Sequence, residues 1–249
     1  MNNNICINKY LDYVKKMLND IEKTQKENIK EASNIISRCI QNKGILHVFS
    51  TGHSHMIVEE MFYRAGGLVQ VNPILDPGLM QHEGAIKSTK LERLSGYAEI
   101  LIESVDFKEN EPIIIISNSG INSVPIEMAM LAKEKGLNVI AITSIQTSST
   151  IESRHESNKK LMDVADIVID NCVPRGDTII DVGSTDQKIG SVSSIAGIFI
   201  VQRLILDIVN NCYEEGKIPP IYTSANMPGG DEHNSKLIYE YKSRVRGLY

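Results

Sequence analysis

The 249-residue sequence has few of the features that mark disulfide scaffolds, membrane proteins and secreted chains. Its four cysteines stand far apart without a C-x-x-C pair, which fits a reducing cytosol better than a disulfide framework. The apolar runs at 113–116 and 195–201 are much shorter than the roughly 18 to 20 residues of a spanning helix. Residues 1–4 lack the basic and then apolar run of a signal peptide. We therefore expect a cytoplasmic protein without a membrane partner.

Positive charge is not in excess either. Lysine and arginine number 26 against 31 aspartates and glutamates, and this net charge of −5 argues against a nucleic-acid partner. Hydrophobic residues make up 42% and charged residues 23%, close to the globular average, which excludes wholesale disorder. A local pocket for a single anion is still compatible with this composition.

Apolar residues recur at helical spacing over residues 5–42, where neither glycine nor proline interrupts them. Residues 24–27, Thr-Gln-Lys-Glu, have the form of a capping box, which would divide the stretch into two helices. We interpret residues 1–43 as a helical arm whose apolar stripe is covered by the body of the fold or by another subunit. Residues 1–42 contain 7 basic against 5 acidic residues and no short turn between compact helices, which argues against a helix-turn-helix.

From residue 44 onward, short apolar runs alternate with helical patterns. We expect strands at 45–49, 68–71, 112–117, 139–143 and 167–170, and helices at 56–65, 90–104, 125–135, 161–165 and 190–215. The four consecutive isoleucines at 113–116 indicate a strand that is buried on both faces. Repeated strand–helix units predict an α/β fold with a doubly wound parallel sheet, in which residues 44–249 form one domain with C-terminal helices.

Two loops that follow predicted strands carry polar residues suited to a ligand. In parallel sheets, ligands gather at the carboxyl ends of the strands, where helix N-termini present free N–H groups to anions. The first loop, residues 50–55, has one glycine where a dinucleotide fingerprint needs three. The second loop, residues 117–123, offers hydroxyls, amides and a glycine as a neutral cradle for a phosphate monoester. The alternative is that its polar residues only form a turn and an N-cap.

Both loops resemble those of the sugar isomerase (SIS) domain family. Gly52-His53-Ser54 matches after the first strand, residues 117–122 stand in place of the family's Ser-x-Ser-Gly-x-Ser/Thr loop, and Thr143-Ser144 fits after the following strand. The resemblance covers about residues 44–215. Residues 62–67, 82–85 and 90–94 look like a bacterial branch of SIS proteins that are often labelled phosphoheptose isomerases.

The resemblance implies a flavodoxin-like fold that binds a phosphorylated sugar as a homodimer or homotetramer, with the site near the subunit boundary. We expect no cofactor. The substrate-binding residues that it implies are Gly52, His53, Ser54, Ser117, Asn118, Ser119, Gly120, Asn122, Thr143 and Ser144. Four of these would hold the phosphate: Ser54, Ser117, Ser119 and Asn122. Asn122 departs from the family's Ser or Thr, although an amide can still donate a hydrogen bond.

Isomerisation of an aldose to a ketose through an enediol needs a carboxylate that moves a proton between C1 and C2, and a second group for the hydroxyl proton. The catalytic candidates are Glu83, His82, His55, Glu60 and His233, and we also considered Glu59, Glu92 and His53. We favour Glu83 with His55 or His82, because functional groups concentrate in loops and helix starts; the alternative is a capping or solvated role. His53-x-His55 lacks a third ligand, so we expect no metal site.

Two alternatives to a sugar-phosphate isomerase stay open. Counting along the first helix to the catalytic His and Glu of the heptose-phosphate isomerases leads to Arg64 and Leu68, which do not match. The stretch with His82, Glu83 and Glu92 loosely resembles the acidic segment of N-acetylmuramic acid 6-phosphate etherases, so a lyase acting on an amino-sugar phosphate is one alternative. A non-catalytic sugar-phosphate sensor is the other.

Overall fold

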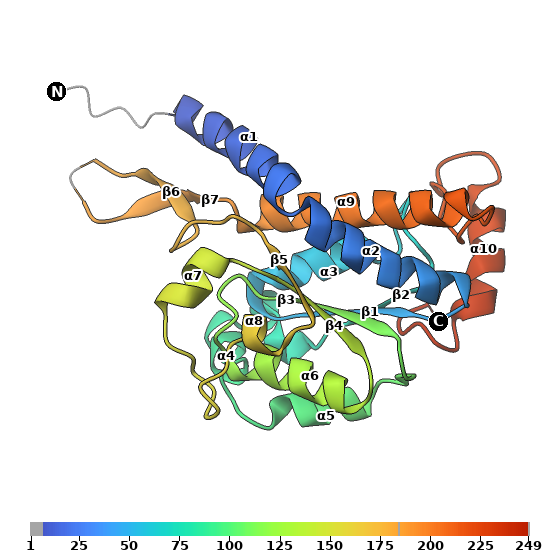
Figure 1. Cartoon of the computed structure of the whole chain (residues 1–249), viewed down its shortest axis with the longest axis horizontal. Coiled ribbons are helices and arrows are strands. Elements are labelled where there is room, and N and C mark those ends of the chain that lie inside the picture. Colours follow the sequence, from blue (N-terminus) through green and yellow to red (C-terminus); the bar gives the residue numbers. More distant parts are fainter. Residues whose placement is uncertain (1–6, 184, 249) are drawn as a thin grey trace.

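The computed structural model describes residues 7–183 and 185–248. One parallel sheet lies between two helical layers (Figure 1). Its strands are β1 (Leu46–Ser50), β2 (Val71–Ile74), β3 (Pro112–Ile116), β4 (Asn138–Thr143) and β5 (Ile167–Asp170). They pair in the order β2-β1-β3-β4-β5, and every pair is parallel. This is the flavodoxin-like order, so the predicted doubly wound sheet is confirmed.

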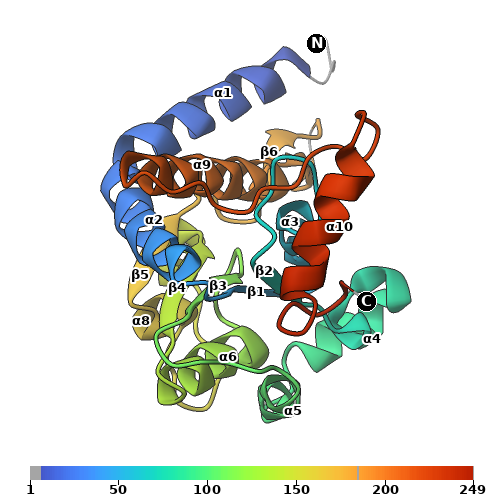
Figure 2. The ribbon, with the colours of Figure 1, turned by 90° about the vertical axis from the view of Figure 1, so that its right-hand side faces the viewer.

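Helices cover both faces of the sheet. One layer contains α1 (Ile7–Thr24), α2 (Lys26–Gln41), α3 (His55–Met61) and α9 (Ser193–Glu214). The other contains α4 (Ala85–Leu91), α5 (Tyr97–Glu103), α6 (Ser123–Glu134) and α8 (Leu161–Val164). Figure 2 shows α1, α2 and α9 on one side of the strands and α4, α5 and α6 on the other. The remaining helices are α7 (Ile145–Thr150) and α10 (Gly230–Tyr241), with short 3-10 turns at Gly52–Ser54, Pro77–Leu79 and Gln81–Glu83.

The isoleucines of β3 join the two cores, because successive side chains of a strand point to opposite faces. Ile114 and Ile116 pack with the layer of α2 and α9. Ile113 and Ile115 pack with the layer of α5 and α6. All four are at most 2% exposed, as the run of apolar residues predicted.

The N-terminal segment forms two helices, α1 and α2, separated by Gln25 alone. The predicted capping box is wrong: Thr24 is the last residue of α1 and donates to the carbonyl of Asp20, while Gln25 at the N-cap makes no side-chain cap. Ile36 and Ile40 of α2 enter the core beside α9. The predicted boundary at residue 43 falls between α2 and β1.

Several predicted element bounds are wrong, because local chain geometry overrides the apolar period. The helix predicted to reach residue 65 ends at Met61, since Phe62 is extended and Tyr63 has a φ of 46°. The helix predicted at 90–104 is two helices, with Gly96 at a φ of 82° before α5. The second strand starts at residue 71, because Leu68 pairs instead with Ile221 in an isolated bridge.

The helix predicted at 190–215 begins at Ser193, after a hairpin of β6 (Thr178–Asp181) and β7 (Lys188–Ser191) that projects from the body beside α1 (Figure 1). Among the described residues, α9 is the one helix long and apolar enough to cross a membrane, with a mean hydropathy of 1.5 over 18 residues. Its residues Ile200, Leu204 and Ile208 are fully buried in the core of this chain. A core helix passes the same test of length and composition.

Candidate functional site

A cleft of about 250 Å³ lies at the carboxyl ends of β1 and β3, where Thr51 follows one strand and Ser117 the other. After β1 the chain continues to β2 at one edge of the sheet, and after β3 it continues to β4 on the other side. Open α/β sheets bind ligands at such a point, where the direction of the connections reverses. The lining residues are Thr51, Gly52, His53, Ser54, Gln81, Ser88, Thr89, Glu92, Ser117, Asn118, Ser119, Asn122, Asp177 and Ser193. Both polar loops noted in the sequence therefore meet in one place.

The second loop presents hydrogen-bond donors to this cleft. The amide of Asn171 donates to Oδ1 of Asn118 at 2.9 Å, which leaves Nδ2 of Asn118 as a donor. Ser117 Oγ accepts from the N–H of Gly120 at 3.2 Å, so its own proton is available. Within the described residues, the backbone N–H groups of Asn118 and Ser119 bond to no protein acceptor. Together these donors form a cradle in front of the N-terminus of α6.

Thr143 and Ser144, at the end of β4 and in the loop after it, pack against this cradle and do not line the cleft. Gly120 has a φ of 62°, and a Cβ there would lie 3.0 Å from Oγ1 of Thr143, so a glycine is required. The N–H of Ser144 donates to the carbonyl of Asn118 at 3.0 Å. The hydroxyl of Ser144 caps α7 by accepting from the N–H of Thr147 at 3.0 Å. Gly120, Thr143 and Ser144 were also predicted to bind substrate, but they do not line the cleft and lie behind the residues that do.

Glu92, which directly follows α4, is the one glutamate in the cleft lining, and it is half-buried. The hydroxyl of Thr51 donates to its Oε2 at 2.9 Å, and Nδ2 of Asn122 donates to its Oε1 at 2.7 Å. Burial raises the pKa of Glu92, and the Thr51 hydrogen bond and the charges of Arg93 and Arg154 oppose this shift. A carboxyl group with a raised pKa in a cleft is a candidate for proton transfer.

Asn122 is 6% exposed and is the N-cap residue of α6, yet its side chain makes no cap hydrogen bond. Its amide instead joins two charged groups, because Nη1 of Arg154 donates to Oδ1 at 2.7 Å while Nδ2 donates to Glu92. Both ends of the amide have partners. Asn122 therefore orients the carboxylate, in addition to lining the place where a phosphate was predicted.

The histidines of the first loop differ in their access to the cleft. His53 is exposed and lines the cleft, as does Ser54. His55 is 7% exposed, with Nδ1 bonded to the carbonyl of Gly52 and Nε2 3.8 Å from Glu59. Of the two, His53 is the imidazole that a ligand in the cleft can contact.

The other predicted catalytic residues do not line the cleft. His82 and Glu83 have side chains 60% and 52% exposed in the turn before α4. Glu60 pairs with Arg64 and accepts from the amide of Gln202. Nε2 of His233 bonds to the carbonyl of Ile221. His233 belongs to α10, at the opposite end of α9 from the cleft (Figure 1), so a role for it requires a second copy.

Sequence reasoning missed Gln81 and Asp177. Gln81, next to the predicted pair, lines the cleft, and its buried Oε1 has no hydrogen-bond partner within the described residues. Asp177 accepts from the N–H groups of Val192 and Ser193 at 3.0 and 2.8 Å, which places its carboxylate on the N-terminus of α9. The only local signal for it in the sequence is its place in a turn-rich stretch, where the structure gives it a φ of 65°. No group of three or more His, Cys, Asp or Glu in the described ranges has the arrangement of a metal site.

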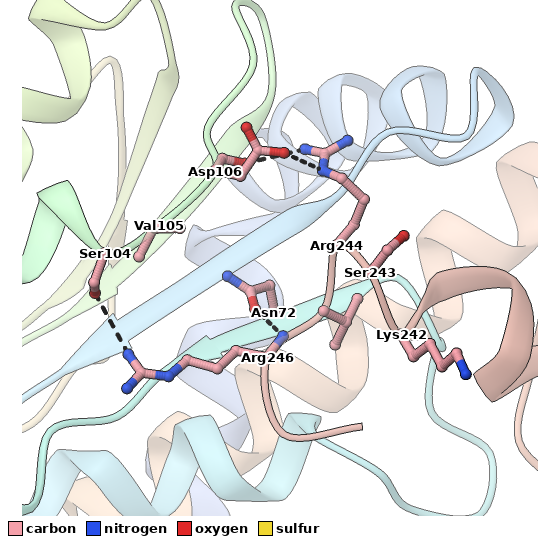
Figure 3. Close-up of a pocket in the computed structure, with 9 residues that line it drawn as sticks. Asn72, Ser104, Val105, Asp106, Lys242, Ser243, Arg244 and Arg246 are labelled. Atoms are coloured by element: carbon pink, nitrogen blue, oxygen red, sulfur yellow. Dashed lines mark hydrogen bonds and ion pairs between the residues drawn. The ribbon is translucent and has the colours of Figure 1, made fainter. Parts of the chain in front are cut away.

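A second hollow, of about 330 Å³, lies at the amino ends of the strands and is built by the C-terminal segment (Figure 3). Arg244 pairs with Asp106 at 3.0 Å and with Glu111 at 2.9 Å. The N–H of Arg246 donates to Oδ1 of Asn72 at 2.7 Å. These contacts fasten the end of the chain to the edge of the sheet, so we give the hollow a structural role.

A parallel sheet of this order, with a donor-rich loop in front of α6, defines a flavodoxin-like α/β protein with a polar cleft at the carboxyl ends of its strands. The SIS domain family matches residues 9–144, and the chain belongs to that family. The match begins within α1, whereas the resemblance carried by the loops begins at residue 44.

Relatives that cover nearly the whole chain belong to the UPF0309 family. A UPF0309 protein from Caldanaerobacter subterraneus subsp. tengcongensis is 44% identical over 242 residues, covering 96% of this chain and 98% of that protein. A UPF0309 protein from Listeria innocua is 39% identical over 239 residues, covering 96% and 97%. The phosphoheptose isomerase of Neisseria gonorrhoeae has the same fold, with a TM-score of 0.56 at 15% identity over 81% of this chain and 96% of that chain.

Proposed function

We propose that this chain binds a phosphorylated sugar and interconverts its aldose and ketose forms, with Glu92 as the carboxylate that moves the proton. One observation carries the proposal: a half-buried carboxylate with a raised pKa lines the same cleft as a loop of free hydrogen-bond donors. The donors suit the phosphate, and the carboxylate suits the reacting carbons.

The phosphate is held without a lysine. The donors belong to Ser117, Asn118 and Ser119, which all line the cleft before the N-terminus of α6 and offer hydroxyls, the Nδ2 of Asn118 and free backbone N–H groups. The positive end of the helix dipole favours an anion there. Ser54 of the first loop completes the ring of hydroxyls.

The proton chemistry follows from the position of Glu92. Ionised Glu92 takes the proton from C2 of the open-chain aldose, and the electron pair forms the C1–C2 double bond of an enediol. The carboxylic acid so formed returns the proton to C1 and yields the ketose. His53 opens the ring and moves the proton between the two oxygens. We assign these roles to Glu92 and His53 in place of Glu83, His55 and His82, because the latter do not line the cleft.

The fold relationships agree with this class of reaction. The solved structures of similar fold include phosphoheptose isomerases from Neisseria gonorrhoeae and Francisella tularensis, the latter with a TM-score of 0.52 at 17% identity over 81% of this chain and 95% of that chain. The carboxylate would also serve an elimination, so an amino-sugar phosphate lyase is the alternative reaction. A sensor would bind without turnover.

The experiment is a panel of aldose and ketose phosphates incubated with the protein in deuterated water and followed by NMR. An isomerase incorporates deuterium at C1 or C2 and keeps every substituent, whereas a lyase releases one. We expect E92Q to lower turnover by about 10² to 10⁴, the range for general acid–base groups. E83Q is the matched control, expected within about twofold of the parent because Glu83 is exposed outside the cleft.

A loss of turnover in E83Q with normal turnover in E92Q would contradict the assignment of the base. S119A tests the phosphate site: thermal stabilisation by sugar phosphates and turnover should both fall, and no change in either would remove the phosphate proposal. Stabilisation without turnover across the panel would favour the sensor.

A further inference from the structure

We infer that the cleft accepts a single anion, so that the substrate is a sugar monophosphate whose other end is a neutral polyol or an amino sugar and never a sugar acid. This inference rests on the phosphate site of the proposed function and specifies the class of substrate. It depends on which helix N-termini are free and which charges line the cleft.

Two long helices direct their N-termini at the cleft, and only one of them is free for a ligand. Asn122, the N-cap of α6, turns its side chain to Glu92. The N–H of Val124 donates to the carbonyl of Glu92 and Pro125 has no N–H, so within the described residues the free donors at this end of α6 are the N–H of Ser123 and those of Asn118 and Ser119 in the loop before it. The N-terminus of α9 is occupied, because Asp177 accepts from the N–H groups of Val192 and Ser193 and from the hydroxyl of Ser193 at 2.8 Å. The carboxylate of Asp177 therefore stands where a second anion would bind.

The charged side chains around the cleft repel a second anion as well. Among the described residues that line it, the formally charged ones are Glu92 and Asp177, and there is no lysine or arginine. The guanidinium of Arg154 donates to Asn122 and does not line the cleft. A ligand carboxylate would face like charge without a cation to offset its desolvation, which is a strong basis for discrimination.

A neutral group finds a partner in the same region. The amide of Gln81 lies beside Gly52, with its Oε1 buried and unpaired within the described residues. An amide bonds to a hydroxyl or an acetamido group in either orientation. A buried amide left unpaired is unfavourable, so a substrate hydroxyl there gains affinity.

The consequence separates the two enzymatic alternatives. An isomerase substrate of this class carries one phosphate and hydroxyl or amino groups. The substrate of an N-acetylmuramic acid 6-phosphate etherase carries a carboxylate in its ether substituent in addition to the phosphate. The charges of this cleft therefore favour the isomerase.

The test compares two ligands that differ only at C1, glucitol 6-phosphate and 6-phosphogluconate. Titration calorimetry on the full chain at pH 8 measures the dissociation constant of each. We expect 6-phosphogluconate to bind at least about tenfold more weakly than glucitol 6-phosphate, because its C1 carboxylate meets Glu92. E92Q and D177N should each reduce this ratio to about threefold or less, since each removes one negative charge. E99Q, which removes an exposed carboxylate on α5, should leave the ratio unchanged.

Equal binding of the two ligands by the parent protein, or a ratio that E92Q and D177N both leave unaltered, would overturn the inference. Failure of both ligands to bind would overturn the inference and the phosphate site together. The expected ratio of dissociation constants, found together with no deuterium incorporation into any sugar phosphate of the NMR panel, would support the inference and refute the isomerase. The binding ratio and the turnover thus report on separate claims.

Discussion

Nδ2 of Asn122 donates to Oε1 of Glu92 at 2.7 Å, so an N-cap residue of one helix orients the carboxylate that follows another. The amide orientation is determined by both partners, because Arg154 can only donate to Oδ1. A residue predicted to bind phosphate has therefore acquired a second role, as a positioning residue for the proposed base.

N122A should lower kcat by about tenfold with little change in KM, because Glu92 keeps its place in the cleft but loses one of its two hydrogen bonds. Steady-state kinetics at several pH values would measure the split. N118A is the matched control, an amide in the same loop whose donor faces the phosphate, and it should raise KM instead. A rise in KM alone for N122A would show that its main contact is with the phosphate.

The pH dependence of turnover should follow the ionisation of Glu92. Its pKa is raised by burial, so activity should fall as the pH drops through a value above the ordinary 4.5. T51V removes the hydroxyl that stabilises the ionised form and should move this acid limb to higher pH. T89V, a threonine that lines the cleft but donates to the carbonyl of Ala85, should leave the limb in place. An unshifted limb in T51V would exclude Glu92 as the titrating group.

E92Q should be at least as stable as the parent protein near pH 8, with a gain of up to about 1 kcal/mol in the free energy of unfolding. The pKa of Glu92 is raised in the folded state, so the folded form favours the proton, and this contribution to stability is lost as the pH rises through the pKa. The difference should vanish near pH 4. Urea unfolding at the two pH values measures it, and a large destabilisation at pH 8 would mean that the ionised carboxylate is structural.

The carboxyl group of Glu111 should make the fold acid-sensitive. Burial alone raises its pKa, but hydrogen bonds from His47, from the N–H groups of Lys108 and Ile45 and from Arg244 lower it to about 2, against an ordinary 4.5. A lowered pKa adds stability above pH 4.5 that is lost as the pH falls toward 2, a contribution of about 3 kcal/mol.

E111Q should therefore flatten the dependence of the unfolding free energy on pH between 4.5 and 2. E109Q, at an exposed position two residues away, is the control and should keep the slope of the parent. Equal slopes in all three proteins would contradict the role of Glu111.

We propose the exposed side of α9 as the interface of the predicted homodimer or homotetramer. Leu206 and Tyr213 lie on one side of that helix and are 66% and 72% exposed. The double variant L206E/Y213E should at least halve the mass measured by light scattering, because two charges would oppose burial of this face. L94E, at an exposed leucine between α4 and α5, should leave the mass unchanged. A monomeric parent protein would refute the predicted oligomer directly.

The parts of this protein that its sequence determined are those encoded by neighbouring residues. Four adjacent isoleucines specify a strand buried on both faces, and a Ser-Asn-Ser-Gly run after that strand specifies a cradle at the start of a helix. Alternating patterns were enough for the order of strands and helices and for the edge of the sheet where the site lies. Helix ends were predicted less well, because Tyr63 and Gly96 adopt positive φ values that the apolar period does not record.

Only the tertiary structure decided which carboxylate enters the cleft. Glu83 ends a 3-10 turn and Glu92 follows α4 nine residues later, but only the chain after α4 brings its carboxylate to the cleft, where Glu92 meets Thr51 and Asn122, 41 and 30 residues away in the chain. Asp177 likewise caps a helix that starts 16 residues later. Contacts over such separations depend on how the loops fold back over the sheet, and no local pattern of residues encodes that geometry.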